Sequence, residues 1–126
     1  MHSLFWICFA GAAGTAARYL IGLWAARQFG PAFPYGTVIV NLTGCFLIGG
    51  VIHIATAQAW PETARLVLTI GFLGGFTTYS SFNQETLRLA ASGAAGDALT
   101  NVAVTVLGGL VAGWLGMMVS RSLLPH

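Results

Sequence analysis

Apolar residues are grouped into four long runs separated by short stretches that contain proline, glycine or charge. A helix that crosses a bilayer needs about 20 mostly apolar residues. Four segments meet this requirement: Leu4 to Ala26, Gly36 to Ala57, Ala64 to Ala90 and Ala98 to Val119. They use most of the 126 residues, so we expect an all-α membrane protein with one domain, residues 1–126, and four transmembrane helices.

The third run has an unusual centre, the stretch from Gly71 to Phe82, which contains adjacent glycines followed by several hydroxyl residues. Glycine costs about 1 kcal/mol relative to alanine in a helix interior, and serine and threonine hydroxyls compete for backbone groups. The pattern therefore predicts a break in the third helix. An unwound segment at membrane depth is tolerated only where protein or a water-filled cavity covers it, so its carbonyls and hydroxyls are expected to bind a ligand.

Composition supports a membrane protein and excludes other classes. Hydrophobic residues make up 56% of the chain and charged residues only 6%, whereas soluble domains carry about 25% charged residues. A net charge of +2 spread over the whole chain does not form a surface for nucleic acid. The sequence also has no Ser/His/Asp set, carboxylate pair or metal-ligand spacing, so it does not predict an enzyme.

The arginines give almost no preference for one orientation in the membrane. With four spans, Arg65 and Arg121 fall on the side of the two termini, and Arg27 and Arg88 fall on the other side. Arg18 lies within the first span. Because loop arginines and lysines set orientation, this balance predicts dual topology and an antiparallel homodimer, in which two protomers enclose a polar path that one would leave open to lipid.

Polar residues inside spans are the candidates for function because they are costly there. Arg18 is either a side chain that reaches the membrane surface or a fixed positive charge that concentrates anions in a vestibule. Asn41 either bonds to a neighbouring helix or donates its amide hydrogens to an anion. The sequence alone leaves both pairs of alternatives open.

The aromatic residues Phe76, Tyr79 and Phe82 recur every three residues, which would place them on one helix face. Such a stripe is either part of a packed core or a set of rings whose positive edges face a small anion.

Glu85 and Arg88 are three residues apart and could form a weak ion pair on the helix surface.

On the fourth span, Asn101 and Thr105 are four residues apart on an otherwise apolar helix. Their side chains either bond back to their own helix or line a path.

Three motifs together resemble the CrcB/Fluc family of fluoride channels. They are Gly11-x-x-Gly14-x-x-Ala17-Arg18-Tyr19, Gly36-Thr37-x-x-Val40-Asn41-x-x-Gly44, and Gly71-Phe-Leu-Gly-Gly-Phe-Thr-Thr-Tyr-Ser-Ser-Phe82 followed by Glu85-Thr86. The resemblance covers the whole chain in the same order. It implies a homodimer of dual topology in the inner (plasma) membrane, with two antiparallel pores that export fluoride passively and relieve fluoride toxicity.

The resemblance also implies site residues. Those of the fluoride pore are Asn41, Tyr79, Ser81, Phe82, Asn101 and Thr105. Tyr79 and Phe82 would match the two rings whose edges face fluoride, although the family usually has phenylalanine at the first of these positions.

Two further groups of residues follow from the same resemblance. Arg18 would match the family's first-helix arginine in the vestibule, and Glu85 the acidic residue near the pore mouth. The backbone carbonyls of Gly75 and Thr78 would match those that hold a buried structural Na⁺ at the dimer interface, two from each chain. Oxygen ligands suit a hard cation.

Two other functions fit the sequence less well. A small proton-coupled multidrug-type exporter would need a titratable carboxylate deep in its first span, and none occurs between Met1 and Val51. A structural subunit without transport activity would account for helix packing through glycine but would leave the polar centre of the third run unexplained.

Overall fold

The computed structural model describes residues 2–124, and these form helices joined by short connections. The helices are α1 (His2–Phe29), α2 (Tyr35–Ala57), α3 (Glu62–Leu66), η1 (Val67–Leu73), α4 (Gly74–Phe76), α5 (Tyr79–Ala91) and α6 (Ala95–Leu123). No strand is present in this part of the chain. The predicted all-α class is therefore confirmed, and the first, second and fourth apolar runs correspond to α1, α2 and α6.

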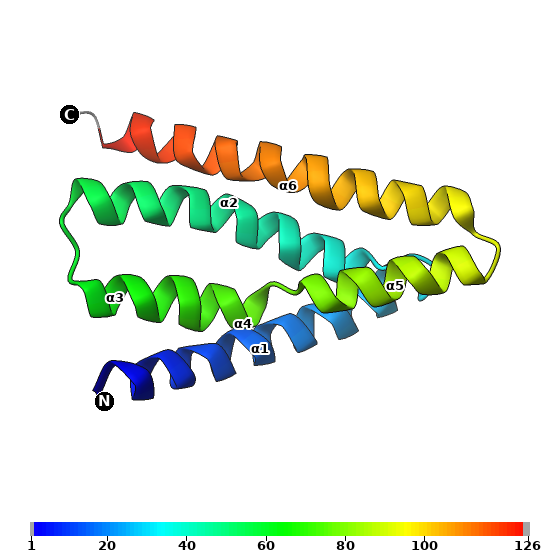
Figure 1. The fold of residues 1–126 in the computed structure, drawn as a ribbon, viewed down its shortest axis with the longest axis horizontal. Coiled ribbons are helices and arrows are strands. Elements are labelled where there is room, and N and C mark those ends of the chain that lie inside the picture. The colour runs from blue at the N-terminus through cyan, green and yellow to red at the C-terminus, as the bar shows by residue number, and fades with distance from the viewer. Residues whose placement is uncertain (1, 125–126) are drawn as a thin grey trace.

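Three helices, α1, α2 and α6, are long and apolar enough to cross a membrane. The third apolar run differs because it is divided into α3, η1, α4 and α5, which follow one another along one path (Figure 1). The long helices and the α3–α5 region run in alternating directions, so that both ends of the described chain lie at the same end of the molecule (Figure 1). This is the arrangement expected for an even number of crossings.

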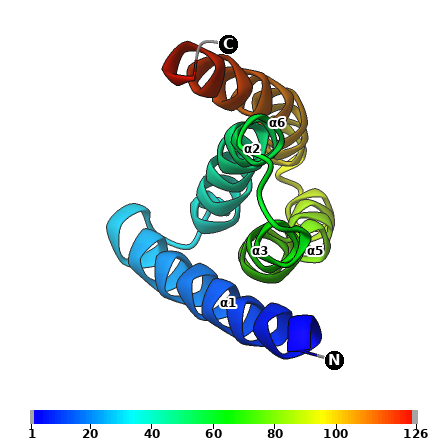
Figure 2. The same cartoon turned by 90° about the vertical axis from the view of Figure 1, so that its left-hand side faces the viewer.

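The helices do not surround a single central core. Seen end-on, α1 and α6 lie on opposite flanks, with α2 and the α3–α5 region between them (Figure 2). Helix α2 packs mainly against α6, and α1 packs mainly against η1 and α4. In α1 only Gly14 and Ala25 are buried, while large residues such as Phe9 and Leu20 are exposed. Apolar surface on this scale indicates contact with lipid or another protein, and the protein is a multi-pass membrane protein.

Glycine sets the close packing between helices. In the α2–α6 contact, a methyl group added to Gly116 would overlap the carbonyl of Phe46, and one added to Gly49 would overlap the carbonyl of Gly113. Small residues let helix backbones approach closely in lipid, where association relies on packing. Close approach at glycine therefore holds α2 against α6.

The first-helix motif serves the same purpose against the third region. A methyl group on Gly14 would overlap the carbonyl of Phe72, and one on Gly75 would overlap the carbonyl of Gly11. Helix η1, a π-helix of seven residues, lies in this contact. Wider π-helical turns are rare and occur frequently at functional sites.

Helical backbone is interrupted between α4 and α5. Thr77 (φ −85°, ψ 160°) and Thr78 (φ −153°, ψ 117°) are extended, and α5 begins again at Tyr79. Thr77 remains bonded to the preceding turn, because its N–H and its hydroxyl both donate to the carbonyl of Leu73 (3.0 Å and 2.9 Å). The interruption therefore lies in the polar centre of the third run.

Candidate functional site

The interruption is held by Asn41 of α2. The Asn41 side-chain oxygen accepts a hydrogen bond from the Thr78 N–H (2.8 Å), and its Nδ2 donates to the Thr78 carbonyl (3.0 Å). Both residues are buried, with exposed fractions of 7% and 8%. Of the two alternatives for Asn41, the structure places its amide against a neighbouring segment. One of its two amide hydrogens has no acceptor among these bonds.

The Thr78 side chain caps the N-terminus of α5. Its Oγ1 accepts from the Ser81 N–H (3.2 Å) and donates to Ser81 Oγ (3.1 Å), and Ser80 Oγ lies 3.3 Å away. A threonine that caps a helix in this way typically contributes about 1 kcal/mol. The hydroxyls that predicted an interruption therefore also start the helix that follows it.

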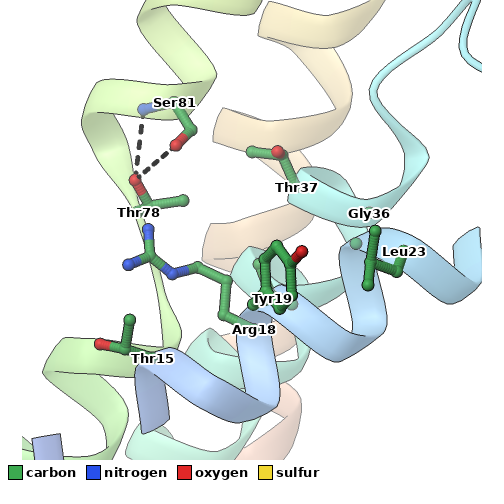
Figure 3. A pocket seen from close by; sticks show the side chains of 10 residues that line it. Thr15, Arg18, Tyr19, Leu23, Gly36, Thr37, Thr78 and Ser81 are labelled. Carbon is green, nitrogen blue, oxygen red and sulfur yellow. Dashed lines mark hydrogen bonds between the residues drawn. The ribbon is translucent and has the colours of Figure 1, made fainter. Parts of the chain in front are cut away.

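A first cavity of about 350 Å³ lies between α1, α2 and the start of α5. Figure 3 shows the Arg18 side chain extending from α1 toward Thr78, with Ser81 beyond it and Thr37 on the α2 side. The residues that line the cavity are Thr15, Arg18, Tyr19, Gly22, Leu23, Gly36, Thr37, Val40, Thr78 and Ser81. The Arg18 guanidinium and the hydroxyls of Tyr19 and Ser81 can still donate hydrogen bonds, and no carboxylate lines the cavity, so the lining favours an anion.

A second cavity of about 420 Å³ lies on the other side of Thr78, between α2, the third region and α6. Its lining is Asn41, Gly44, Cys45, Ile48, Thr69, Leu73, Gly74, Thr77, Thr78, Tyr79, Phe82, Thr105 and Val106. The rings of Tyr79 and Phe82 meet here, with centroids 5.6 Å apart and planes tilted by 59°. Phe82 is buried, whereas Tyr79 is 80% exposed, so its ring is left uncovered by a single chain.

Phe76 does not belong to this pair, and the prediction of one three-residue aromatic face was wrong. Phe76 is buried and stacks on Phe72, with ring centroids 5.8 Å apart and planes at 13°. The reason is that the helical period was extended across Thr77 and Thr78. These two extended residues rotate α5 relative to α4, so only Tyr79 and Phe82 share the second cavity.

The two cavities divide the predicted pore residues. Asn41, Tyr79, Phe82 and Thr105 line the second cavity, whereas Ser81 lines the first, beside Arg18. Thr78 lines both.

Asn101 lines neither of these two cavities. It is completely buried, donates to Thr86 Oγ1 (2.9 Å) and accepts from Thr105 Oγ1 (3.5 Å). It therefore ties α6 to α5 and orients Thr105. The partner, Thr86, was not predicted, although its position one turn after Phe82 is a signal that could have indicated it.

Glu85 has a partner that its spacing did not predict. Its Oε1 accepts a hydrogen bond from the Thr37 hydroxyl (2.8 Å), a residue 48 positions earlier in the chain. Glu85, Thr37 and Arg88 line a third cavity of about 180 Å³ near the end of α1. Arg88 thus shares a cavity with Glu85, while the bond that fixes the carboxylate comes from α2. Thr37 also lines the first cavity, so it connects the two.

The carbonyl oxygens at the interruption fit a hard cation. The Thr78 N–H bonds to Asn41, so it does not close a helical turn onto the preceding segment. The Gly75 carbonyl accepts only a long bond from Thr15 Oγ1 (3.5 Å). A carbonyl oxygen has two lone pairs. The bond from Asn41 occupies one lone pair of the Thr78 carbonyl, so the carbonyls of Thr78 and Gly75 can each offer a lone pair to a cation. Within residues 2–124 no group of three His, Cys, Asp or Glu side chains could hold a metal ion.

These features define a class: a small multi-pass membrane protein with a cavity on each side of an interrupted helical segment, one carrying a positive charge and the other lined by aromatic and neutral residues. The family described as "CrcB-like protein, Camphor Resistance (CrcB)" matches residues 5–117. The chain belongs to this family, and the resemblance drawn from its motifs is confirmed.

Proteins of known name match nearly the whole length of this chain. A protein from Sorangium cellulosum named "Fluoride-specific ion channel FluC" is 49% identical over 125 residues, 98% of this chain and 98% of its own length. Proteins of the same name from Citrifermentans bemidjiense and Chloroflexus aurantiacus are 45% and 43% identical, over 98% and 96% of this chain and 100% and 97% of their own lengths. These relatives are named as channels, which supports the prediction that the chain is not an enzyme.

Proposed function

We propose that this protein is a fluoride-selective ion channel that exports fluoride passively across the plasma membrane and so relieves fluoride toxicity. The observation that carries the proposal is a pair of cavities on either side of Thr78, one with the Arg18 charge and one with the Tyr79 and Phe82 rings, in a chain whose full-length relatives are named fluoride-specific channels. Conduction requires contacts strong enough to admit an ion and weak enough to release it. Hydroxyls, amides and ring edges meet this requirement.

The working unit is an antiparallel homodimer of dual topology, and the α3–α5 region is its broken third membrane span. The 80% exposure of Tyr79 supports the dimer, because a polar phenol at the mouth of a cavity would face lipid in a single chain. A second copy covers that side and closes the path. The near-equal distribution of arginines lets both orientations insert.

Fluoride is collected in the first cavity and passes through the second. Arg18 provides the positive charge of the vestibule and Ser81 a hydroxyl beside it. Glu85 lies at the mouth, where Thr37 fixes its carboxylate. Tyr79 and Phe82 then present ring edges, whose partial positive charge stabilises an anion without a formal charge. Thr105 lines the same cavity, and its hydroxyl donates to Asn101 only across 3.5 Å, a long bond that leaves it able to turn toward the ion.

A structural Na⁺ is held where the two protomers meet. The carbonyls of Gly75 and Thr78 from one chain, doubled by a two-fold axis, provide four oxygen ligands. Hard cations prefer such ligands, and a bound cation would offset the cost of unpaired backbone groups in the membrane. We expect the dimer to lose thermal stability when sodium is replaced by a large organic cation, as measured by size-exclusion chromatography after heating.

Fluoride efflux from liposomes tests the function. Purified protein is reconstituted, the vesicles are loaded with fluoride, and release is followed with a fluoride electrode, with chloride release measured in parallel. We expect rapid fluoride release once the membrane potential is dissipated and little release of chloride. Equal release of both anions would reject selectivity, and no release of fluoride from correctly folded protein would reject the channel.

A further inference from the structure

The bonding between Asn41 and Thr78 requires a side chain that presents a donor and an acceptor side by side, as a primary amide does. In extended backbone, the N–H and C=O of one residue point to the same side. Thr78 has this conformation (φ −153°, ψ 117°), and the Asn41 amide meets both groups, at 2.8 Å and 3.0 Å. The side chain therefore pairs with Thr78 as a neighbouring strand would.

These two bonds fix the backbone on both sides of Thr78. The N–H belongs to the peptide unit before Thr78 and the C=O to the unit after it, so both dihedral angles of Thr78 are constrained at once. Aspartate can accept from the N–H but cannot donate to the carbonyl when ionised, and alanine can do neither. Asparagine is thus suited to this position by its paired donor and acceptor.

Helix α2 supports the same segment one turn further along. A methyl group added to Gly44 would overlap the Thr77 side chain, so Thr77 packs directly against the α2 backbone. Asn41 and Gly44 are three residues apart and lie on one face of α2. The extended residues are therefore held by two consecutive contacts with a regular helix.

We propose that Asn41 is a positioning residue for the cation site: it holds Thr78 extended and so aims the Thr78 carbonyl at the bound Na⁺. The inference rests on the sodium site of the proposed function and adds to it a residue that does not touch the ion. Asn41 also lines the second cavity together with Tyr79 and Phe82. One side chain therefore links the cation site to the wall of the fluoride path.

The consequence is that sodium affinity depends on Asn41. The test compares wild type with Asn41→Ala in detergent and measures thermal stability across a sodium titration, with lithium and potassium as alternative cations. We expect the sodium concentration at half-maximal stabilisation to rise by about 10-fold or more, and the preference for sodium over potassium to weaken. An unchanged midpoint and preference would overturn the proposal.

A matched control separates positioning from a general loss of stability. Asn101 is also a buried amide with two side-chain bonds, but it connects α5 and α6 and does not touch the interruption. Asn101→Ala is expected to lower thermal stability while leaving the sodium midpoint within about twofold of wild type. If both variants shift the midpoint equally, the role assigned to Asn41 is wrong.

A measurement on the unaltered protein covers the case in which Asn41→Ala does not fold. Hydrogen exchange at the Thr78 amide reports the bond to Asn41 directly. We expect slow exchange in sodium and exchange at least about 10-fold faster when sodium is replaced by a large organic cation. Exchange that is fast in both conditions, or slow and independent of sodium, would overturn the proposal.

The sodium inference and the fluoride proposal fail in different ways. If wild-type stability does not respond to sodium, the cation site and the role of Asn41 in it are both wrong, while selective fluoride release from liposomes still stands. If fluoride is not released but the sodium midpoint responds to Asn41→Ala, the positioning role stands and the channel assignment fails.

Discussion

The two cavities beside Thr78 differ in charge. The first contains a fixed charge, Arg18, surrounded by hydroxyls, whereas the second is lined by the rings of Tyr79 and Phe82 and by neutral polar groups. A formal charge attracts an anion over a distance of several ångströms, but an anion paired with it in a dry site would leave slowly. The difference indicates two tasks: the first cavity concentrates fluoride, and the second lets it pass.

The largest effect is expected from removing both rings of the second cavity. In Tyr79→Ile with Phe82→Ile, branched aliphatic side chains replace ring edges and offer an anion no partial positive charge. We expect fluoride efflux to fall by about 100-fold or more, which corresponds to about 2.7 kcal/mol in the barrier. Phe72→Ile is the matched control, because Phe72 stacks on Phe76 and lines neither cavity. Undiminished efflux in a folded double variant would refute the pore assignment.

A negative charge in the second cavity is the next test. Asn41→Asp places a carboxylate beside the path and also removes the donor to the Thr78 carbonyl. We expect efflux to fall by about 10- to 100-fold, because even partly screened charges a few ångströms apart repel by one to several kcal/mol. Thr56→Asp adds the same charge at an exposed position in the last turn of α2 that does not line the second cavity, and we expect normal efflux. Efflux that is equal in both variants would contradict the proposed path.

The first cavity is distinguished from the second by its response to salt. Arg18→Gln removes the fixed charge but keeps hydrogen-bond donors. We expect efflux at low ionic strength to fall by about 10-fold, in the range by which charged clefts raise local ion concentration. At high salt the difference should shrink to about twofold, because screening shortens the reach of Arg18 to about 3 Å at 1 M. A reduction independent of salt would mean that Arg18 binds the ion directly.

The sequence predicted the position of this site better than its internal contacts. The glycines and hydroxyls between Gly71 and Phe82 are a local signal, and the extended residues Thr77 and Thr78 lie within that stretch. The partner of Thr78 is 37 positions away. Its identity depends on how α2 packs against the third region, and sequence spacing does not contain that information.

The predicted aromatic face was wrong because it assumed a helical period across residues that are not helical. The spacing of Phe76, Tyr79 and Phe82 is correct for one helix face only if every residue between them is helical. Two extended residues were enough to move Phe76 into a different contact. The π-helix over Val67–Leu73 was also not predicted, because its residues are those of an ordinary apolar helix.

The smallest effect is expected from Tyr79→Phe, which tests whether the second cavity works through ring edges or through a hydroxyl. The change removes the phenol oxygen and keeps the ring whose centroid lies 5.6 Å from that of Phe82. If edge polarity stabilises the ion, phenylalanine serves as well as tyrosine, and fluoride efflux should change by less than about threefold, which corresponds to about 0.65 kcal/mol. A loss as large as that of the double isoleucine variant would show that Tyr79 acts as a hydroxyl donor, and the two cavities would then share one mode of anion binding.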